Sequence, residues 1–566
     1  MIIMNNTNKL LENLFDTPQL NEKLPGLRGI LQTTDYINFI ILSDIGNEIY
    51  KFTGAKLANQ CLPGDHVKWD GEMCQLELRD EYPPIVGTLE LTNKSKYGLT
   101  SKGYPIYLFT PYNKCYPHFI VGCSEKDITK NRIGIIKFDK WLNSTFPRGI
   151  LQQILGVSGD FKAEKQALIW QACPWKYPKG PYPPKSTENI LRTEIKGYTF
   201  NIDPLGCKDI DDVITFENID NDMWKISITI SDVATYVEDG CTVDIFASLI
   251  SQTLYDKDGT VLCPMLPKEY SEQVCSLMPE KNSYGISLQF VWDGQSITNI
   301  EWCESSLKTD ASYTYDEFQE LNSPYKIILA KIASYIANED VVDSHKWIEY
   351  CMLFYNMEAG KMLKEAQMGI LRRHNTPDLE RLEKYSKSGS QIASLVEKLA
   401  YSSAEYCLAE EIETHHYGLK SDTYAHTSSP IRRYVDLVNQ RALKYIIRKS
   451  NERYIVPIAM YDINYRTKLN KNFERDLDFL NAISTDCLNF KGIIIEKQIK
   501  DFIKIKIYIP LWKRTISAKY KYIGEKVLSR DEKREIDVTD FREVEIKCAF
   551  NVNSRNWKDR VVINII

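Results

Sequence analysis

The chain has 566 residues, 43% of them hydrophobic and 26% charged, and its 71 Lys and Arg against 76 Asp and Glu give a formal net charge of −5. This length predicts three to five domains, and the ordinary composition excludes a chain that is disordered throughout. No apolar run approaches the roughly 18–20 residues that cross a bilayer, and the N-terminus lacks the pattern of a signal peptide. The 14 Cys are scattered without a Cys-x-x-Cys pair, which favours reduced thiols over disulfides or a zinc ribbon. We therefore expect a cytoplasmic protein without a membrane partner, with the nucleus as the alternative location.

Positive charge is concentrated at the C-terminal end. Residues 488–566 carry 18 Lys and Arg against 11 Asp and Glu, so this segment has a balance of +7 and the remainder of the chain −12. A basic module on an acidic chain is typical of a nucleic-acid enzyme whose contacts lie in one channel. Surplus lysines on the surface of the last domain explain the same numbers, so charge alone leaves both interpretations open.

The first 185 residues read as short strands and turns. Segments rich in Ile, Thr, Tyr and Leu alternate with Gly, Pro and Asn, which predicts two small barrels, 1–85 and 86–185. The second region ends in CPWKYPKGPYPPK, residues 173–185, whose five Pro are incompatible with a helix or a central strand. We interpret this run as a linker or an extended strap.

Residues 186–486 begin with strand-like segments such as GYTFNIDP and WKISITISDVATYV. From about residue 310 onward, apolar positions recur every three to four residues, which predicts helices. The clearest helical patterns cover 325–337, 346–367 and 389–413. In the last region, 487–566, Ile alternates with Lys at a period of two, which predicts the strands of a further small barrel.

The segment DPLGCKDIDD places four carboxylates within ten residues: Asp203, Asp209, Asp211 and Asp212. A strand would put Asp209 and Asp211 on one face and Asp212 on the other, whereas a turn can bring all four together. Gathered carboxylates repel each other unless a cation lies between them, and Mg²⁺ is the hard cation that leaves positions open for phosphate and water. A pair of such ions can stabilise the attacking and leaving oxygens of a phosphoryl displacement. A solvated acidic loop or a structural calcium loop is the alternative, although the spacing of a helix–loop–helix calcium site is absent.

The second informative segment is YAHTSSPIRRYVDLVNQR, residues 424–441. Ser429 is a good helix N-cap and Pro430 suits the first helical position. Arg432 and Arg433 would then lie at the positive end of the helix dipole, which costs stability unless an anion binds there. The free backbone N–H groups and the two guanidiniums therefore predict a phosphate site.

We expect this helix to extend to about Lys449, with Asp436 holding the guanidinium of Arg432 one turn away. An Arg–Asp pair on a solvated helix face, without any ligand, is the alternative. For His426 we expect a buried, hydrogen-bonded histidine without a chemical role.

Taken in order, these motifs resemble the ribonuclease II (RNB) family of processive exoribonucleases. DPLGCKDIDDVI is similar to the acidic signature of the family, and YAHTSSPIRRYVDLVNQR to its arginine signature. ITISDVATYVEDG, TLYDKDGTVLCPMLPKEYSEQVCSL, WIEYCMLFYNMEAG and LRRHNTP match in order between them, and NKNFERD follows. The resemblance covers about 300 residues, 193–486. Upstream, FTPYNKCYPHFIVG and FPRGILQQILGVSGDFKAEKQALI are similar to the second cold-shock-type barrel of the eukaryotic, exosome-type branch.

The resemblance implies an α+β multidomain fold. It assigns 1–85 and 86–185 to two cold-shock-type OB barrels, the second with its Pro-rich linker, 186–486 to an RNB catalytic domain, and 487–566 to a C-terminal OB-like RNA-binding barrel. Because the sequence begins directly with the barrels, we expect the endonuclease domain that precedes them in the exosome subunit to be absent. We therefore expect a monomer that is independent of an exosome core.

The resemblance also implies roles for the acidic residues. Asp203 and Asp212 match the carboxylates that hold the main Mg²⁺ on the scissile phosphate, with Mn²⁺ as the alternative ion. Asp209 and Asp211 match those that complete the second-metal site and grip the terminal ribose. Together with Arg432, these two are the expected catalytic residues.

Five residues are expected to bind RNA. Tyr255 matches the aromatic that stacks on the last base, and Arg432 the arginine that stabilises the transition state, supported by Arg433. His374 lies in the LRRHNTP motif, and Glu474 matches a carboxylate near the 3′ nucleotide. Ordinary core packing for Tyr255 and a helix-surface charge for Glu474 are the alternatives.

The resemblance implies Mg²⁺-dependent hydrolysis from the 3′ end of single-stranded RNA, processive and releasing nucleoside 5′-monophosphates. A catalytically inactive RNA-binding regulator on the same fold is the main alternative, and a DNA-directed nuclease is a third. The chain departs from the family pattern at Ser283, where many relatives have Arg, at Thr427, which replaces an aromatic, and at Gln440, which replaces a His.

Overall fold

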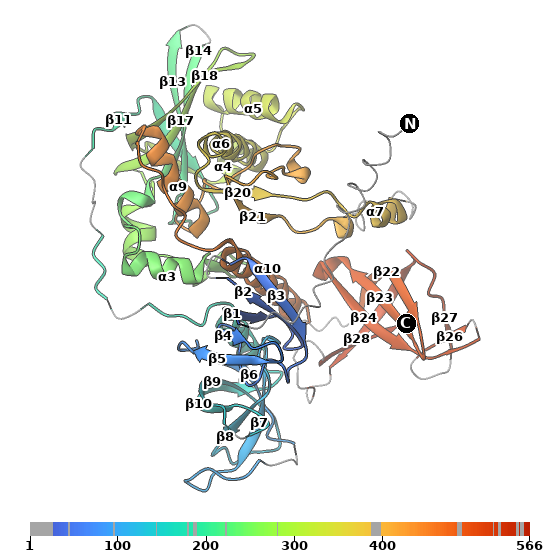
Figure 1. The fold of residues 1–566 in the computed structure, drawn as a ribbon. Helices are drawn as coiled ribbons and strands as arrows, with labels where there is room; N and C mark the ends of the chain where they lie inside the picture. Colours follow the sequence, from blue (N-terminus) through green and yellow to red (C-terminus); the bar gives the residue numbers. More distant parts are fainter. Residues whose placement is uncertain are drawn as a thin grey trace, which may run out of the picture. The chain divides into compact units, whose positions relative to one another are not determined.

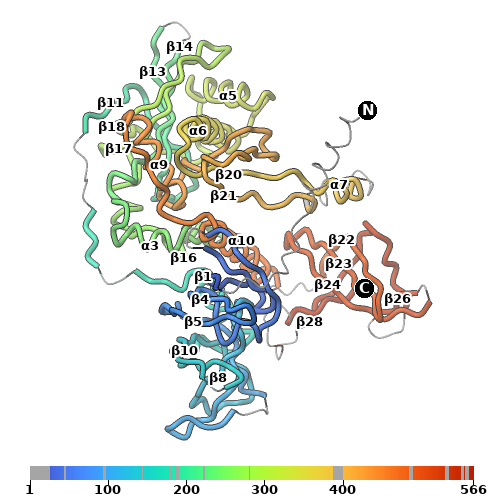
Figure 2. The backbone as a smooth tube through the Cα atoms, in the orientation of Figure 1, coloured from blue at the N-terminus to red at the C-terminus, as the bar shows by residue number. Residues whose placement is uncertain are grey.

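The computed structural model describes most of the chain in two compact units, one formed by residues up to 129 with 134–153, the other by 130–133 with 154–566. Figures 1 and 2 follow the chain from its blue to its red end. The described residues are 26–43, 46–93, 97–142, 144–177, 180–184, 190–220, 223–279, 281–386, 398–483, 489–524, 526–529, 534–550, 554 and 560–566. No helix within these ranges is long and apolar enough to cross a membrane.

The first region forms a five-stranded antiparallel sheet in the order β3-β2-β1-β4-β5. The strands are β1 (Leu27–Thr33), β2 (Asn38–Leu42), β3 (Glu48–Thr53), β4 (His66–Trp69) and β5 (Cys74–Leu78). Alternate residues of β1 and β2 point into one core, in which the rings of Phe39 and Phe52 stack with centroids 5.1 Å apart. This period of two is the pattern that predicted strands here.

The second region is a closed barrel in the order β10-β8-β7-β6-β9. Its strands are β6 (Ile85–Leu89), β7 (Ile106–Pro111), β8 (Phe119–Gly122), β9 (Arg132–Lys140) and β10 (Arg148–Val157). Helix α2 (Phe161–Ala172) follows, and its first turn is capped by Asp160, which accepts a hydrogen bond from the Ala163 N–H at 2.9 Å. After α2 the described parts of the Pro-rich run, 173–177 and 180–184, form neither helix nor strand, as predicted.

A seven-stranded mixed sheet forms the centre of the third region, in the order β11-β18-β17-β14-β13-β12-β19. The strands are β11 (Thr193–Glu194), β12 (Tyr198–Ile202), β13 (Asp212–Asp220), β14 (Met223–Ser231), β17 (Asn282–Trp292), β18 (Ile297–Lys308) and β19 (Ala311–Tyr313). The four long strands pair antiparallel, and Gly285 allows a close approach, because a Cβ there would lie 2.2 Å from Thr229 Cγ2.

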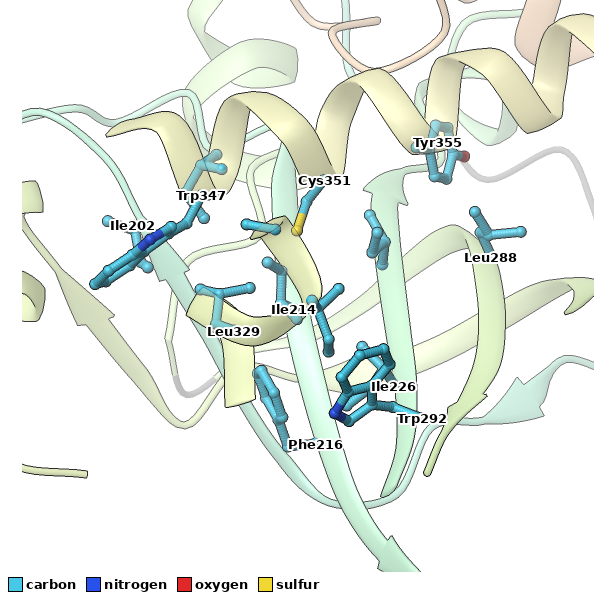
Figure 3. Close-up of a cluster of buried hydrophobic side chains, with 14 of the residues drawn as sticks. Ile202, Ile214, Phe216, Ile226, Leu288, Trp292, Leu329, Trp347, Cys351 and Tyr355 are labelled. Carbon is cyan, nitrogen blue, oxygen red and sulfur yellow. The ribbon is translucent and has the colours of Figure 1, made fainter. Parts of the chain in front are cut away.

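Three helices pack on one face of this sheet: α4 (Tyr315–Glu320), α5 (Pro324–Ala337) and α6 (Ser344–Ala366). The predictions for 325–337 and 346–367 are confirmed. Helix α5 begins after the cap Ser323 with Pro at its first position and ends at Asn338 in the left-handed conformation. Figure 3 shows side chains of α6, such as Trp347 and Tyr355, in one cluster with those of the strands, such as Ile202 and Leu288.

The remaining elements of this region follow β14, β16 and α6 in the sequence. They are η1 (Val233–Thr235), α3 (Thr242–Ile250), β15 (Leu254–Tyr255), β16 (Val261–Cys263), η2 (Glu269–Val274), β20 (Ile370–Arg373), α7 (Leu379–Ser386), η3 (Lys398–Ala400), β21 (Glu405–Leu408), η4 (Tyr417–Leu419), α9 (Tyr434–Ile447) and α10 (Met460–Ile483).

The predicted helix over 389–413 is wrong in its described part. Residues 398–400 form a single 3₁₀ turn, and 405–408 form β21, which pairs antiparallel with β20. Tyr406 and Cys407 are buried by this pairing, so their apolar spacing reflects a strand partner and not a helix face. The part 389–397 lies outside the described residues.

The C-terminal region contains a five-stranded antiparallel sheet in the order β24-β23-β22-β28-β29 and a small three-stranded sheet. The elements are β22 (Asn489–Ile499), β23 (Ile503–Ile509), η5 (Pro510–Trp512), β24 (Arg514–Tyr520), β25 (Tyr522–Ile523), β26 (Lys526–Leu528), β27 (Glu535–Ile536), β28 (Glu543–Phe550) and β29 (Val561–Ile565). In β23 every Ile is buried while Lys504 and Lys506 are partly exposed, so the predicted alternation is confirmed. The fold class predicted from the sequence, α+β with small barrels around a central mixed domain, is therefore confirmed.

We predict that Leu329→Ala destabilises the central domain by about 2–5 kcal/mol, because Leu329 is fully buried between α5 and the sheet. Ile327→Ala is the matched control, since this residue of the same helix is 56% exposed. Calorimetric unfolding of both variants checks the prediction. Equal shifts in the two variants would contradict the assigned core.

Candidate active site

The acidic segment is the connection between two paired strands of the central sheet. Strand β12 ends at Ile202, β13 begins at Asp212, and the residues between them form an exposed turn at Gly206. Gly206 has φ +83°, a conformation that favours glycine. Asp203 is tied to the neighbouring strand, because its N–H donates to the Tyr313 carbonyl at 3.0 Å. The turn therefore reverses the chain direction, with Asp203 before it and the other three aspartates after it.

Each of three carboxylates accepts a hydrogen bond from a different donor. Asp203 accepts from the side chain of Asn201 at 2.9 Å, and Asp209 from the Tyr255 hydroxyl at 2.9 Å. Asp211, only 5% exposed, accepts from the Ile431 N–H at 3.0 Å. The hydroxyl of Tyr255 thus lies beside the acidic segment.

The carboxylates are close enough to perturb one another. Burial raises the pKa of Asp211 to about 7, with a further rise from Asp209, while Arg432 acts in the opposite direction. The pKa of Asp212 is raised well above its usual range by burial and then by Asp203 and Asp211. The pKa of Asp203 is also raised, by burial and by Asp209. The direction of these shifts is the one that the spacing of the four residues predicted, with burial as the largest cause and repulsion between the carboxylates as a further one.

Across the described ranges, no group of three or more His, Cys, Asp or Glu side chains is arranged to hold a metal ion. In this arrangement the carboxylates of Asp203, Asp209 and Asp211 each accept a hydrogen bond from a separate protein donor. Their chemistry nevertheless fits a hard divalent cation, since the ligand atoms are all carboxylate oxygens and burial with mutual repulsion disfavours their charged forms.

The arginine segment differs from the prediction at its start. Helix α9 begins at Tyr434, not at Pro430, and Ser429 is not its cap. Arg433 is extended, with φ −131° and ψ 124°, because it forms an isolated β-bridge with Gln252. The Arg432 carbonyl accepts from the Thr253 N–H at 3.0 Å. Pairing with this distant segment keeps the residues before Tyr434 out of the helix.

The turn before α9 brings Arg432 to the acidic segment. Its Nε lies 3.5 Å from Asp211 Oδ2, and its Nη2 donates to Ser429 Oγ at 3.0 Å. The Arg432 side chain is still 41% exposed, so part of the guanidinium faces solvent. The arrangement supplies a fixed positive charge beside a cluster of carboxylates.

The spacing predicted that Asp436 holds Arg432, but Asp436 pairs with Arg433 instead. Its fully buried carboxylate accepts from Arg433 Nη2 at 2.7 Å and from the Ser429 N–H at 2.8 Å. The observed pair has i, i+3 spacing, in place of the i, i+4 spacing predicted for Arg432 and Asp436. Arg433 is therefore occupied inside the protein.

His374 and Glu474 make no hydrogen bond or ion pair with the four aspartates in the described part of the chain. His374 Nδ1 accepts from the Gly418 N–H at 3.2 Å, and Nε2 lies 2.9 Å from the Ser402 carbonyl, so both ring nitrogens are occupied. Glu474 lies on α10, where partial desolvation raises its pKa. Their contacts to RNA stay predictions.

His426 is hydrogen-bonded as predicted, because its Nδ1 lies 2.7 Å from the Tyr406 hydroxyl. Burial, and then Arg433 and Arg372, lower its pKa well below the usual range, so the ring is neutral. The imidazole thus carries no charge in the middle of a group of arginines.

Two buried asparagines, which the sequence reasoning missed, fix the same segment. Asn356 of α6 accepts from the N–H and the hydroxyl of Thr427 at 2.9 and 2.8 Å. Asn439 of α9 donates to the His426 carbonyl at 2.9 Å. A signal was present, because Asn356 stands among apolar residues of a predicted helix. Two of the departures from the family pattern can thus be placed. Thr427 forms hydrogen bonds with Asn356, whereas the buried hydroxyl of Ser283 has no hydrogen-bond partner among the described residues.

Two known protein families match this chain. The RNB domain matches residues 192–326 and 322–449, and the Dis3-like cold-shock domain 2 matches 106–172. These matches coincide with the mixed sheet, the acidic and arginine segments, and the closed barrel. Residues 192–449 therefore match the RNB domain, in the part of the chain where the motifs predicted it.

Among curated relatives, the probable exosome complex exonuclease RRP44 of Caenorhabditis elegans is 25% identical over 63% of this chain and 47% of its own length. The human exosome complex exonuclease RRP44 is 24% identical over 69% of this chain and 51% of its own. Ribonuclease R of Escherichia coli is 22% identical over 44% of this chain and 39% of its own. The chain thus spans about half the length of the RRP44 relatives, or less for ribonuclease R.

Two solved structures share the fold. The apo form of Mycoplasma genitalium RNase R has a TM-score of 0.70 at 18% identity, over 95% of this chain and 100% of that one. Yeast Ssd1, described as a pseudonuclease, has a TM-score of 0.61 at 17% identity, over 91% of this chain and 80% of that one. The same fold therefore occurs in a ribonuclease and in a pseudonuclease, and the site residues must separate the two possibilities.

We predict that Asp436→Ala destabilises the protein by about 3–5 kcal/mol, because it leaves the Arg433 guanidinium and the Ser429 N–H without their buried acceptor. Glu349→Ala is the control, since the Glu349–Lys346 pair is about half exposed and contributes less than about 1 kcal/mol. Urea unfolding of the two variants measures the difference. Similar losses in both would contradict the buried pair.

Proposed function

We propose that this protein is a hydrolytic 3′–5′ exoribonuclease that degrades single-stranded RNA processively to nucleoside 5′-monophosphates. The observation that carries the proposal is the contact of Arg432 and the Ile431 N–H with Asp211 inside the cluster of four aspartates. RNB relatives whose names say exonuclease or ribonuclease support it, as does the fold shared with RNase R in complex with ribose-methylated single-stranded RNA.

Asp203, Asp209, Asp211 and Asp212 would hold the divalent cation, Mg²⁺ or alternatively Mn²⁺. Their oxygen-only donor set suits these ions. When bound, such an ion makes a water molecule more acidic and neutralises charge on the phosphate. Burial, and then repulsion between the carboxylates, raises the pKa of Asp203 and Asp212, and both effects favour the binding of a cation there.

Arg432 and Tyr255 would bind the end of the RNA. The exposed part of the Arg432 guanidinium can donate to the scissile phosphate and stabilise the negative charge that develops during hydrolysis. The Tyr255 hydroxyl is fixed by Asp209, which leaves the ring to stack on a base, a contact that accepts any base and contributes about 1–3 kcal/mol.

A catalytically inactive RNA-binding regulator is the second candidate, because yeast Ssd1 has the same fold and is described as a pseudonuclease. The four aspartates and Arg432 favour the hydrolase, since a binding module has no need of a buried, self-repelling acidic cluster. The proposal extends to a monomer that acts in the cytoplasm on the RNA 3′ end without an exosome core.

We predict that wild-type protein with Mg²⁺ converts single-stranded RNA to mononucleotides, and that Asp212→Asn abolishes this conversion but retains RNA binding. The neutral amide of Asp212→Asn removes a ligand of the cation. EDTA should stop the wild-type reaction, because it removes the cation itself. Labelled products resolved on a gel, with a filter-binding assay, measure both properties. Asp220→Asn, at the other end of β13, is the matched control.

Intact RNA with the wild-type protein would favour the regulator, and internal fragments would contradict attack at the 3′ end. A matched DNA strand tests the third possibility, a DNA-directed nuclease.

We predict that Arg432→Met lowers kcat by about 10²–10³-fold, because the charge that stabilises the transition state is removed. Arg432→Lys should recover part of the loss, since it restores the charge but not the forked geometry. Arg453→Met is the control, because this arginine pairs with Glu410 on the surface. Single-turnover rates with Mg²⁺ measure the effect, and a wild-type rate in Arg432→Met would exclude the assigned role.

A further inference from the structure

Gln440 is a buried residue of α9 whose side chain bridges two backbone groups of another element. It is 1% exposed. Its Nε2 donates to the Ser231 carbonyl at 2.6 Å, and its Oε1 accepts from the Ala234 N–H at 3.0 Å. One side chain therefore spans the bend between the end of β14 and η1, with one donor and one acceptor.

The bend that Gln440 holds is in turn bonded to the acidic segment. The Ser231 N–H donates to the backbone carbonyl of Asp211 at 2.8 Å. The register continues in the next pair, where Asp212 lies opposite Ile230. Ser231 is thus the single residue that links Gln440, through its carbonyl, to the backbone of Asp211, through its N–H.

The residues just before α9 hold Asp211 from its other side. The Ile431 N–H donates to its carboxylate at 3.0 Å, and Arg432 lies 3.5 Å from it. The contacts therefore form a closed ring, in which α9 and the turn before it reach Asp211 twice. Residues 431–432 contact the carboxylate of Asp211, and Gln440 contacts the backbone of Asp211 indirectly, through Ser231.

We propose that Gln440 is a positioning residue that sets Asp211 in register with Arg432, an inference that rests on the proposed function. A neutral amide is suited to this place, because it donates to one backbone group and accepts from another without burying a charge. Loss of the ring would displace a reacting group with little change in RNA contacts, and small displacements lower turnover strongly.

Gln440→Met tests the proposal, because it keeps the length and volume of the side chain and removes both hydrogen bonds. Gln440→Glu retains the acceptor for the Ala234 N–H but not the donor to Ser231. Gln289→Met is the matched control, since Gln289 is a buried glutamine of the same sheet, 6% exposed, that donates to Ser227 Oγ at 3.0 Å outside the ring.

We expect kcat on single-stranded RNA to fall about 10–100-fold in Gln440→Met, with KM little changed and Gln440→Glu between this variant and the wild type. Gln289→Met should lower the melting temperature without a comparable loss of kcat. Equal losses of kcat in Gln440→Met and Gln289→Met, or a rise in KM that accounts for the whole effect, would overturn the proposal.

Hydrogen–deuterium exchange gives a second measurement that does not depend on activity. Gln440→Met should speed exchange in the peptide that contains Ser231 and Ala234, and Gln289→Met should leave that peptide unchanged. If the wild type does not hydrolyse RNA, the proposed function fails while exchange still decides whether Gln440 holds the ring. Unchanged exchange in both Gln440 variants would overturn the proposal even in an active enzyme.

Discussion

The contact between Asp211 and the turn before α9 joins two segments that lie 220 residues apart in the sequence. Burial among other carboxylates penalises the charged form of Asp211, and this cost must be offset by donors that are fixed in place. The Ile431 N–H and Arg432 supply these donors. The position of α9 relative to the sheet therefore determines whether these donors can stabilise the buried carboxylate of Asp211.

A buried network of charges fixes that position. Lys444 of α9 donates to Asp232 and to the Thr235 hydroxyl, and Arg192 also donates to Asp232. Glu304 of β18 accepts from Arg448 at the C-cap of the helix. Such a network is costly to bury unless it is complete, but a complete one permits a single arrangement of the elements that it joins. The helix thus meets the sheet in one register.

Local patterns account for the elements that could be predicted from the sequence, and long-range pairing accounts for those that could not. The alternation in β23 and the apolar period of α5 and α6 are properties of the segments themselves. The start of α9 depends on Gln252 and Thr253, which pair with Arg433 and Arg432 across a large sequence separation. No capping rule applied to 424–441 contains that information. The prediction of a helix over β21 is wrong for the same reason, because its partner strand β20 lies outside the segment that carried the helical pattern.

The charges at the site also explain why cations are central to the proposed function. Arg433 pairs with Asp436, so in the described part of the chain Arg432 is the basic residue that forms an ion pair with the four aspartates, and the sum is about −3 when all are ionised. A phosphate of RNA would add repulsion to this cluster. Two divalent cations would bring the sum of the aspartates, Arg432 and one phosphate close to zero. Under the proposed function, cations that enter with the RNA would therefore offset the charge of the ionised aspartates, which Arg432 alone does not balance.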